Sequence, residues 1–232
     1  MSAITLYDLA GADPSLRFSP FCWRTRLALA HKGLPVETIA WRFTNKDAIA
    51  FSGQGRVPVL VDGDRTVFDS WTIAEYLDQT YGDRPSLLGD EPVAALTRFV
   101  NAWTNTVIHP ALAPLVLVDI YACIDDGDKA YFRSSRENVF GRTLEEVSAN
   151  RDTDVVAFRR TLEPLRATLQ AQSFIAGATP AYADYIVFGA FQWARCVSSF
   201  RLLEENDPVA AWRQRMLEAF GGLAGRAPGH AV

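Results

Sequence analysis

Hydrophobic and polar positions divide the first third of the chain into short strand-like and helix-like segments. Short apolar, partly β-branched runs predict strands, whereas apolar residues at helical spacing predict helices. The expected elements are a strand at 3–9, a helix at 23–33, a strand at 36–41, a hairpin at 58–70 and a helix at 70–82. The hairpin turn falls at Asp62-Gly63-Asp64, and Gly33 and Gly82 end the two helices. Residues 42–57 carry no clear pattern.

The remainder of the chain has a different pattern of apolar residues, which predicts helices and no sheet. Residues 83–92, DRPSLLGDEP, contain Pro and Gly and read as a connector between domains. From Val93 onward the apolar residues recur at helical spacing and no strand pair is evident. We therefore expect an α/β domain at 1–84 and an all-helical domain at 93–232. The Gly-rich end of the chain, residues 221–232, is expected to fray.

Composition excludes several classes of function. The 232-residue chain carries a formal net charge of −4 and no basic run, so general nucleic-acid binding is not expected. No uninterrupted apolar run approaches about 20 residues, and no signal pattern opens the sequence, so no membrane association is expected. Three scattered cysteines suggest no disulfide framework and favour a reducing cytoplasm. None of the three histidines has metal-ligand spacing, so no metal is expected.

The stretch SPFCWRTRLALAHKG, residues 19–33, contains the first candidate for chemistry. Ser19 followed by Pro20 is a strong helix-start signal, which places the Ser19 hydroxyl among free backbone N–H groups at the positive end of a helix. Such a position suits an anion, although Ser19 is equally interpretable as a simple cap. Cys22 stands where a resolving cysteine would stand, but its neighbours Phe21 and Trp23 favour a packed, inert thiol.

Two further loops carry patterns that fit the same interpretation. In RVPV, Pro58 lies at the start of a strand, where a cis proline would turn the backbone of Val57 outward to pair with an extended peptide. Asp69 and Ser70 begin the helix at 70–82, where a carboxylate, a hydroxyl and free N–H groups suit an amino-acid head group. Each pattern alone is common, and their order along the chain makes them informative.

That order resembles the cytosolic glutathione transferases over essentially the whole chain. The resemblance rests on S-P-x-C-W-R, then R-V-P-V-L, then D-S-x-x-I-A-E-Y-L, followed by a helical half. More narrowly, residues 4–9, 19–33, 67–85 and 135–147 are similar to bacterial glutathione-dependent β-aryl etherases and their fungal relatives. The resemblance implies a thioredoxin-like domain that binds glutathione, a helical domain that supplies most of the second-substrate pocket, and a homodimer.

Transferred residue by residue, the resemblance assigns roles to specific positions. Ser19 matches the catalytic serine that hydrogen-bonds the glutathione sulfur, and Val57 and Pro58 match the backbone-pairing residue and the cis-proline. Asp69 and Ser70 match the pair that holds the γ-glutamyl end. Arg56 and Lys46 are both candidates for the glycine carboxylate, and Lys46 is equally interpretable as a solvated loop lysine.

The second-substrate pocket is less well specified. Aromatic residues that could line it, each also interpretable as core, are Tyr7, Phe21, Trp103, Tyr121 and Phe140. Residues 135–137 either face the same pocket or form a solvated helix face, and the solvated face is favoured. Asp184 matches an aspartate of a buried helix, but Ala181 occupies the family's hydroxyl cap position, so either Thr179-Pro180 starts that helix early or the cap is missing.

These observations favour an enzyme, a glutathione transferase that acts on a small hydrophobic, aromatic electrophile, with β-aryl ether cleavage as the narrower form. Two alternatives stay open. One is a thiol-disulfide reductase that uses Cys22. The other is a protein that binds glutathione or another ligand without turnover, since binding and turnover require nearly the same residues.

Overall fold

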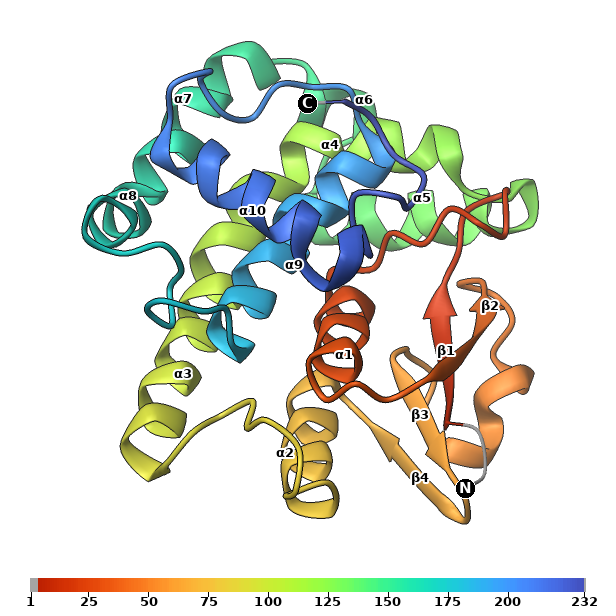
Figure 1. The fold of residues 1–232 in the computed structure, drawn as a ribbon. Coiled ribbons are helices and arrows are strands. Elements are labelled where there is room, and N and C mark those ends of the chain that lie inside the picture. Colours follow the sequence, from red (N-terminus) through yellow and green to blue (C-terminus); the bar gives the residue numbers. More distant parts are fainter. Residues whose placement is uncertain (1–3, 232) are drawn as a thin grey trace.

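The computed structural model describes residues 4–231 and contains a four-stranded mixed sheet followed by a helical half (Figure 1). The strand order is β2-β1-β3-β4, with β1 parallel to β2 and antiparallel to β3. The strands are β1 (Ile4–Leu9), β2 (Val36–Trp41), β3 (Val59–Asp62) and β4 (Arg65–Phe68). The expected strands and hairpin are confirmed, except that Ala3 lies outside the described residues. The unassigned stretch forms a 3-10 helix, η1 (Asp47–Ser52).

Helices complete both halves. In the first half, α1 (Pro20–His31) and α2 (Ser70–Thr80) pack against each other beside the sheet (Figure 1). The helices of the second half are α3 (Glu91–Trp103), the π-helical turn η2 (Thr104–Ile108), α4 (His109–Cys123), α5 (Asp126–Phe140), α6 (Leu144–Ser148), α7 (Arg151–Thr161), α8 (Glu163–Ala171), α9 (Tyr182–Val197) and α10 (Pro208–Gly222). The predicted fold class, an α/β half followed by a helical bundle, is confirmed.

The strand register brings three loops to one edge of the sheet. Val59 pairs with Tyr7 of β1 on one side and with Phe68 of β4 on the other. The end of β1, the start of β3 and the end of β4 therefore lie side by side. Because Asp69 directly follows Phe68, it reaches the edge at which Pro58 enters β3.

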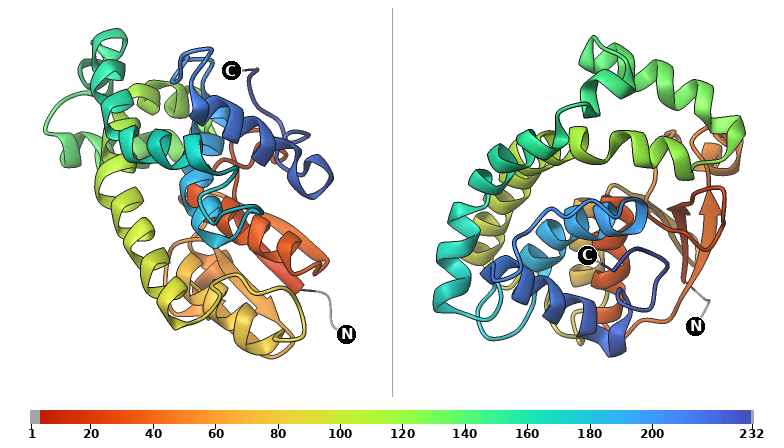
Figure 2. Two further views of the ribbon diagram at one scale, coloured as in Figure 1. Left: turned by 60° about the vertical axis from the view of Figure 1, so that its left-hand side comes forward. Right: turned by 90° about the horizontal axis from the view of Figure 1, so that it is seen from above.

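Segments α3, η2 and α4 form one continuous helix, Glu91–Cys123, seen as a single long path in both views of Figure 2. Pro110 lacks an N–H to donate and its ring crowds the preceding turn, which accounts for the wider π turn just before it. An 18-residue window of this helix has a mean hydropathy of 1.6, long and apolar enough to span a membrane by length and composition alone. The sequence analysis did not predict it, because polar residues such as Asn101 and His109 interrupt its apolar runs. In this structure 33% of that window is buried, and α4, whose buried side chains include Leu112 and Val116, packs against α6, α7 and α9.

Close packing of α1 on α9 connects the two halves. A Cβ placed on Gly189 of α9 would lie 2.5 Å from the Pro20 carbonyl oxygen, so only glycine permits this approach. Four residues further along α1, the buried Arg24 donates to the side-chain oxygens of Asn101 and Asn105, both at 2.9 Å. These contacts hold the beginning of α1 against the helical half.

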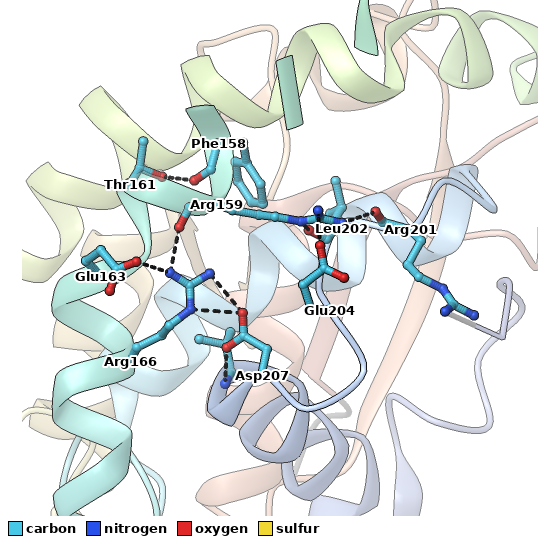
Figure 3. A network of polar contacts seen from close by, with 10 residues as sticks. Phe158, Arg159, Thr161, Glu163, Arg166, Arg201, Leu202, Glu204 and Asp207 are labelled. Carbon is cyan, nitrogen blue, oxygen red and sulfur yellow. Dashed lines mark hydrogen bonds and ion pairs between the residues drawn. The ribbon is translucent and has the colours of Figure 1, made fainter. Parts of the chain in front are cut away.

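A polar network braces the far end of the helical half (Figure 3). Arg166 of α8 donates to Asp207 at 2.9 and 2.8 Å and to Glu163 at 2.7 Å. Arg159 of α7 donates to the Leu202 carbonyl oxygen at 2.9 Å and pairs with Glu204. The two arginines thus attach the α7–α8 corner to the segment that leads into α10, remote from the sheet edge described above.

The start of α9 decides between two alternatives that the sequence left open, and the C-terminal segment differs from what the sequence predicted. Asp184, not a hydroxyl at Ala181, satisfies the start of α9: its carboxylate accepts from the amides of Ile175, Ala176 and Ala181 and from the Trp212 indole. Helix α9 therefore does not start early at residues 179–180. The segment 224–230 is docked and not frayed, because Arg195 donates to the carbonyl groups of residues 224, 225 and 227 and its own carbonyl accepts from the His230 amide. The last residue of the predicted frayed segment, Val232, lies outside the described residues.

Candidate active site

Ser19 lies at the mouth of α1 as the N-cap residue. Its Oγ accepts a hydrogen bond from the Cys22 backbone amide at 3.2 Å, and Pro20 occupies the first turn. The side chain is buried yet lines a cavity of ≈ 600 Å³ between the two halves of the chain. Its hydroxyl proton remains available to a ligand in that cavity, next to the positive end of the helix.

The second and third loops meet at the same sheet edge. The Val57–Pro58 peptide bond is cis, and Val57 lines the cavity. Asp69 caps α2, accepting from the amides of Trp71 at 2.9 Å and Thr72 at 3.1 Å, with a positive φ of 69°. Ser70 is buried, and its carbonyl accepts from the Tyr182 hydroxyl. The three predicted loops therefore meet at one sheet edge; of their residues Ser19 and Val57 line the cavity, whereas Pro58, Asp69 and Ser70 do not.

Both candidates for the glycine carboxylate line the cavity. Lys46 donates from Nζ to the Gly55 carbonyl at 2.7 Å and lies 4.8 Å from the centre of the Trp41 ring. Burial, followed by the charge of Arg56, lowers the pKa of Lys46. Lys46 is therefore not a freely solvated lysine, and Arg56 is the more exposed of the two.

Eight Phe, Tyr and Trp residues line the cavity, but only two of the predicted aromatic residues are among them. Phe21 and Phe140 line it. Tyr7, Trp103 and Tyr121 do not, and instead pack half-buried against the core. Aromatic lining residues that the sequence analysis did not single out are Phe18, Trp41, Phe43, Tyr131, Phe132 and Trp193. The sequence analysis could not identify them, because periodicity does not reveal which aromatic residues face a cavity once the chain has folded.

His109 is a cavity residue that the sequence analysis missed. It directly follows the π turn, and its ring meets Phe21 edge-on at 5.3 Å and Trp193 at 5.9 Å. Burial, with a contribution from Arg24, lowers its pKa to about 3. His109 is thus a neutral imidazole at physiological pH, and its buried Nε2 has no hydrogen-bond partner among the described residues.

Arg136 of α5 also lines the cavity, so of the two interpretations of residues 135–137 the cavity-facing one holds for this residue and the favoured solvated face is wrong for it. Its guanidinium lies 4.9 Å from the centre of the Phe132 ring, and burial lowers its pKa. The adjacent Glu137 instead pairs with Arg133 at 2.9 Å.

Cys22 is inaccessible despite its position one turn beyond Ser19. Its side chain is 0% exposed. Burial, followed by the charge of the buried Asp8, raises the pKa of the thiol well above its ordinary value. Cys196 is likewise buried, whereas Cys123 is only partly so, and all three are free thiols. Within residues 4–231, no group of three or more His, Cys, Asp or Glu side chains is arranged to hold a metal ion.

Two family models match the chain, the glutathione S-transferase N-terminal domain over residues 18–80 and the C-terminal domain over residues 95–220. Glutathione S-transferase 4 of Zea mays is 28% identical over 213 residues, which cover 90% of this chain and 85% of that protein. Mouse glutathione S-transferase omega-1 is 26% identical, covering 87% and 74%.

Among solved structures, the glutathione S-transferase CsGST63524 of Ceriporiopsis subvermispora in complex with glutathione is 27% identical, with a TM-score of 0.77. The similarity covers 97% of this chain and 95% of that one. A second transferase of the same fungus, CsGST83044, also in complex with glutathione, is 26% identical with a TM-score of 0.76, covering 98% and 97%. With both of its domains matched and a cavity between them, the chain belongs to the glutathione S-transferase superfamily.

Proposed function

We propose that this protein conjugates glutathione to small aromatic electrophiles, with Ser19 stabilising the glutathione thiolate. The observation that carries the proposal is the position of the Ser19 hydroxyl, which caps α1 and lines a cavity that eight Phe, Tyr and Trp residues also line. An aromatic wall suits a flat hydrophobic substrate. The two complexes of similar fungal transferases with glutathione support glutathione as the co-substrate.

The proposed binding mode follows the loops at the sheet edge. Extended glutathione pairs with the backbone of Val57 beside Pro58, and its γ-glutamyl head group contacts Asp69 and Ser70. Its glycine carboxylate meets Lys46 or Arg56, the two cations of the first half that line the cavity. The sulfur then lies near Ser19.

Serine activates the sulfur by favouring its charged form. A free thiol has a pKa of about 8.5 and is mostly protonated at neutral pH. A hydrogen bond to a charged group contributes roughly 1.5–3 kcal/mol, and one pKa unit corresponds to about 1.4 kcal/mol. One hydroxyl and the helix end therefore lower the thiol pKa by about one to two units, which makes the thiolate a major species at neutral pH.

β-Aryl ether cleavage is the narrower form of this proposal. The thiolate attacks the ether-bearing carbon, a carbon–sulfur bond forms, and the carbon–oxygen bond breaks with the electron pair leaving on a phenolate, which then takes a proton. The aromatic residues on the walls of the cavity support binding of an aryl ether. The alternative that uses Cys22 for disulfide exchange is disfavoured, because that thiol is fully buried with a raised pKa.

The proposal also includes a homodimer and a cytoplasmic location. Leu96 and Phe99 of α3 are each 70% exposed, an apolar surface that supports a two-fold homodimer in which the same face meets its copy. Three free cysteines support a reducing cytoplasm.

The experiment combines calorimetry with a substrate panel. We expect glutathione to bind at micromolar to millimolar concentration and to be consumed with a halogenated nitrobenzene or a β-aryl ether, but not with a mixed disulfide. Binding without consumption of any electrophile would favour a non-catalytic glutathione-binding protein. The absence of both binding heat and a thermal shift at saturating glutathione would refute the proposal.

A further inference from the structure

The cavity contains three cations and no acidic side chain. Lys46 and Arg56 come from the loop between β2 and β3, whereas Arg136 comes from α5 in the helical half. Within residues 4–231, none of the three forms an ion pair with a carboxylate, whereas Arg26, Arg42 and Arg133 each do. Lys46 and Arg136 are partly buried, and their neutral hydrogen-bond partners replace only part of the hydration that the charges lose, so the cavity favours an anionic occupant.

Arg136 is placed differently from the other two cations. Its guanidinium lies over the rings of Phe132 and Phe43, at 4.9 and 5.9 Å from their centres. Among the described residues, its guanidinium donates a hydrogen bond to the adjacent Ser135 hydroxyl at 3.0 Å, a neutral partner on the same helix. The remaining N–H groups of the guanidinium are free for a ligand. The arginine is thus held by aromatic rings on the side of the cavity formed by the helical half.

The charges of glutathione do not account for all three cations. Of the three anionic groups of glutathione, the γ-glutamyl carboxylate is proposed to lie at Asp69 and Ser70 and the thiolate at Ser19. The glycine carboxylate remains for Lys46 and Arg56, which both lie on the half of the chain that is proposed to bind it. Burial lowers the pKa of Arg136 and the charge of Arg56 lowers it further, so the two cations are close enough to repel each other. A second anion between them would relieve that repulsion.

We propose that Arg136 binds a carboxylate on the ring of the aromatic second substrate, so that the preferred electrophiles are aromatic acids. The inference rests on the proposed function and specifies its substrate class. The guanidinium presents a planar fork that matches a carboxylate, while Phe132 and Phe43 contact the attached ring. Arg136 then acts as a specificity-determining residue and takes no part in bond making.

The test compares a chloronitrobenzoate with the chloronitrobenzamide of the same ring substitution. In each conjugation the carbon–sulfur bond forms, the carbon–chlorine bond breaks and chloride leaves with the electron pair. We expect Arg136→Gln to lower kcat/KM for the benzoate by about 10- to 100-fold, through KM, and to change the benzamide reaction by less than about threefold. Arg136→Lys should recover part of the loss. Arg142 is exposed and lies just beyond α5. Arg142→Gln removes the same charge as Arg136→Gln and should leave kcat/KM unchanged for both substrates.

Other outcomes separate the inference from the function beneath it. An equal loss on both substrates, or a rise confined to the KM for glutathione, would overturn the inference and leave the transferase intact, the latter by assigning Arg136 to the glycine carboxylate. If the parent enzyme conjugates neither compound, the proposed function fails. The inference is then decided by tryptophan-fluorescence binding of the benzoate and benzamide: a benzoate preference that Arg136→Gln abolishes supports it, and no preference refutes it.

Discussion

The backbone amide of Cys22 donates a hydrogen bond to the hydroxyl oxygen of Ser19 at 3.2 Å. This contact orients the hydroxyl as an acceptor toward its own helix and leaves its proton for a ligand in the cavity. Cys22 itself is fully buried and does not line the cavity. Ser19 therefore combines a structural role, capping α1, with its proposed chemical role, and each variant of the site must be interpreted with both in mind.

Asp69 offers a variant that separates capping from binding. Asn caps helices as well as Asp and tolerates a positive φ, so Asp69→Asn should leave the thermal unfolding midpoint close to that of the parent. It removes the charge proposed to meet the γ-glutamyl ammonium, so glutathione affinity measured by calorimetry should fall by about tenfold. Asp90→Asn, at the N-cap of α3, is the matched control. Unchanged affinity in Asp69→Asn would remove Asp69 from the binding site.

His109 should contribute to acid lability of the fold. Its folded-state pKa is about 3, below the ordinary value of 6.5. Between these two pH values the imidazole is protonated in the unfolded chain and neutral in the folded chain. Its contribution to stability is therefore present above about pH 6.5 and is lost as pH falls toward 3. Between pH 7 and pH 5 the parent should lose about 2 kcal/mol more of its free energy of unfolding than His109→Gln. Urea titrations at both pH values measure this, and equal losses would contradict it.

Asp184 should be among the most sensitive polar positions for stability. Its carboxylate accepts three backbone amides and the Trp212 indole while almost fully buried. Asp184→Ala leaves those donors unpaired, so the free energy of unfolding should fall by roughly 3–5 kcal/mol. Asp64→Ala, in the exposed hairpin turn, should cost far less. A chemical denaturation series makes the comparison, and similar losses for the two variants would argue against this role.

The sequence predicted the sheet edge well because its signals are local. The cap at Ser19, the proline at the start of β3 and the Asp69-Ser70 helix start each depend on a few neighbouring residues. The order of these three patterns along the chain matches that of a known family, and this resemblance assigned their roles. The strands, the hairpin and both helices of the first half formed for the same local reasons.

The second-substrate cavity was predicted poorly because its residues come from distant segments. Arg136 and Glu137 are adjacent in sequence, yet one lines the cavity and the other pairs with Arg133. His109 reaches the cavity where the π turn shifts the helix register, which no simple periodicity contains. The docked end of the chain depends on Arg195, whose contacts are about 30 residues away in sequence.

The apolar face of α3 provides a test of assembly. We expect the parent chain of 25.7 kDa to show twice that mass by light scattering. Phe99→Asp places a charge on the 70% exposed position proposed to lie in the interface, and it should shift the mass toward the monomer. Val156→Asp, at an exposed apolar position of α7, is the control. A parent monomer at all micromolar concentrations would refute the dimer.

The pH–rate profile of Ser19→Ala, measured beside that of Cys22→Ala, tests the proposed mechanism most directly. Loss of the hydroxyl should raise the pKa of the bound glutathione thiol by about one to two units, with most glutathione affinity retained. The rate at neutral pH should then fall by about tenfold or more, and the deficit should shrink as pH rises and the thiol ionises unaided. Cys22→Ala should keep the profile of the parent, because that thiol is buried and takes no part. A Ser19→Ala enzyme that matches the parent, together with an inactive Cys22→Ala enzyme, would contradict the account and assign the chemistry to the cysteine.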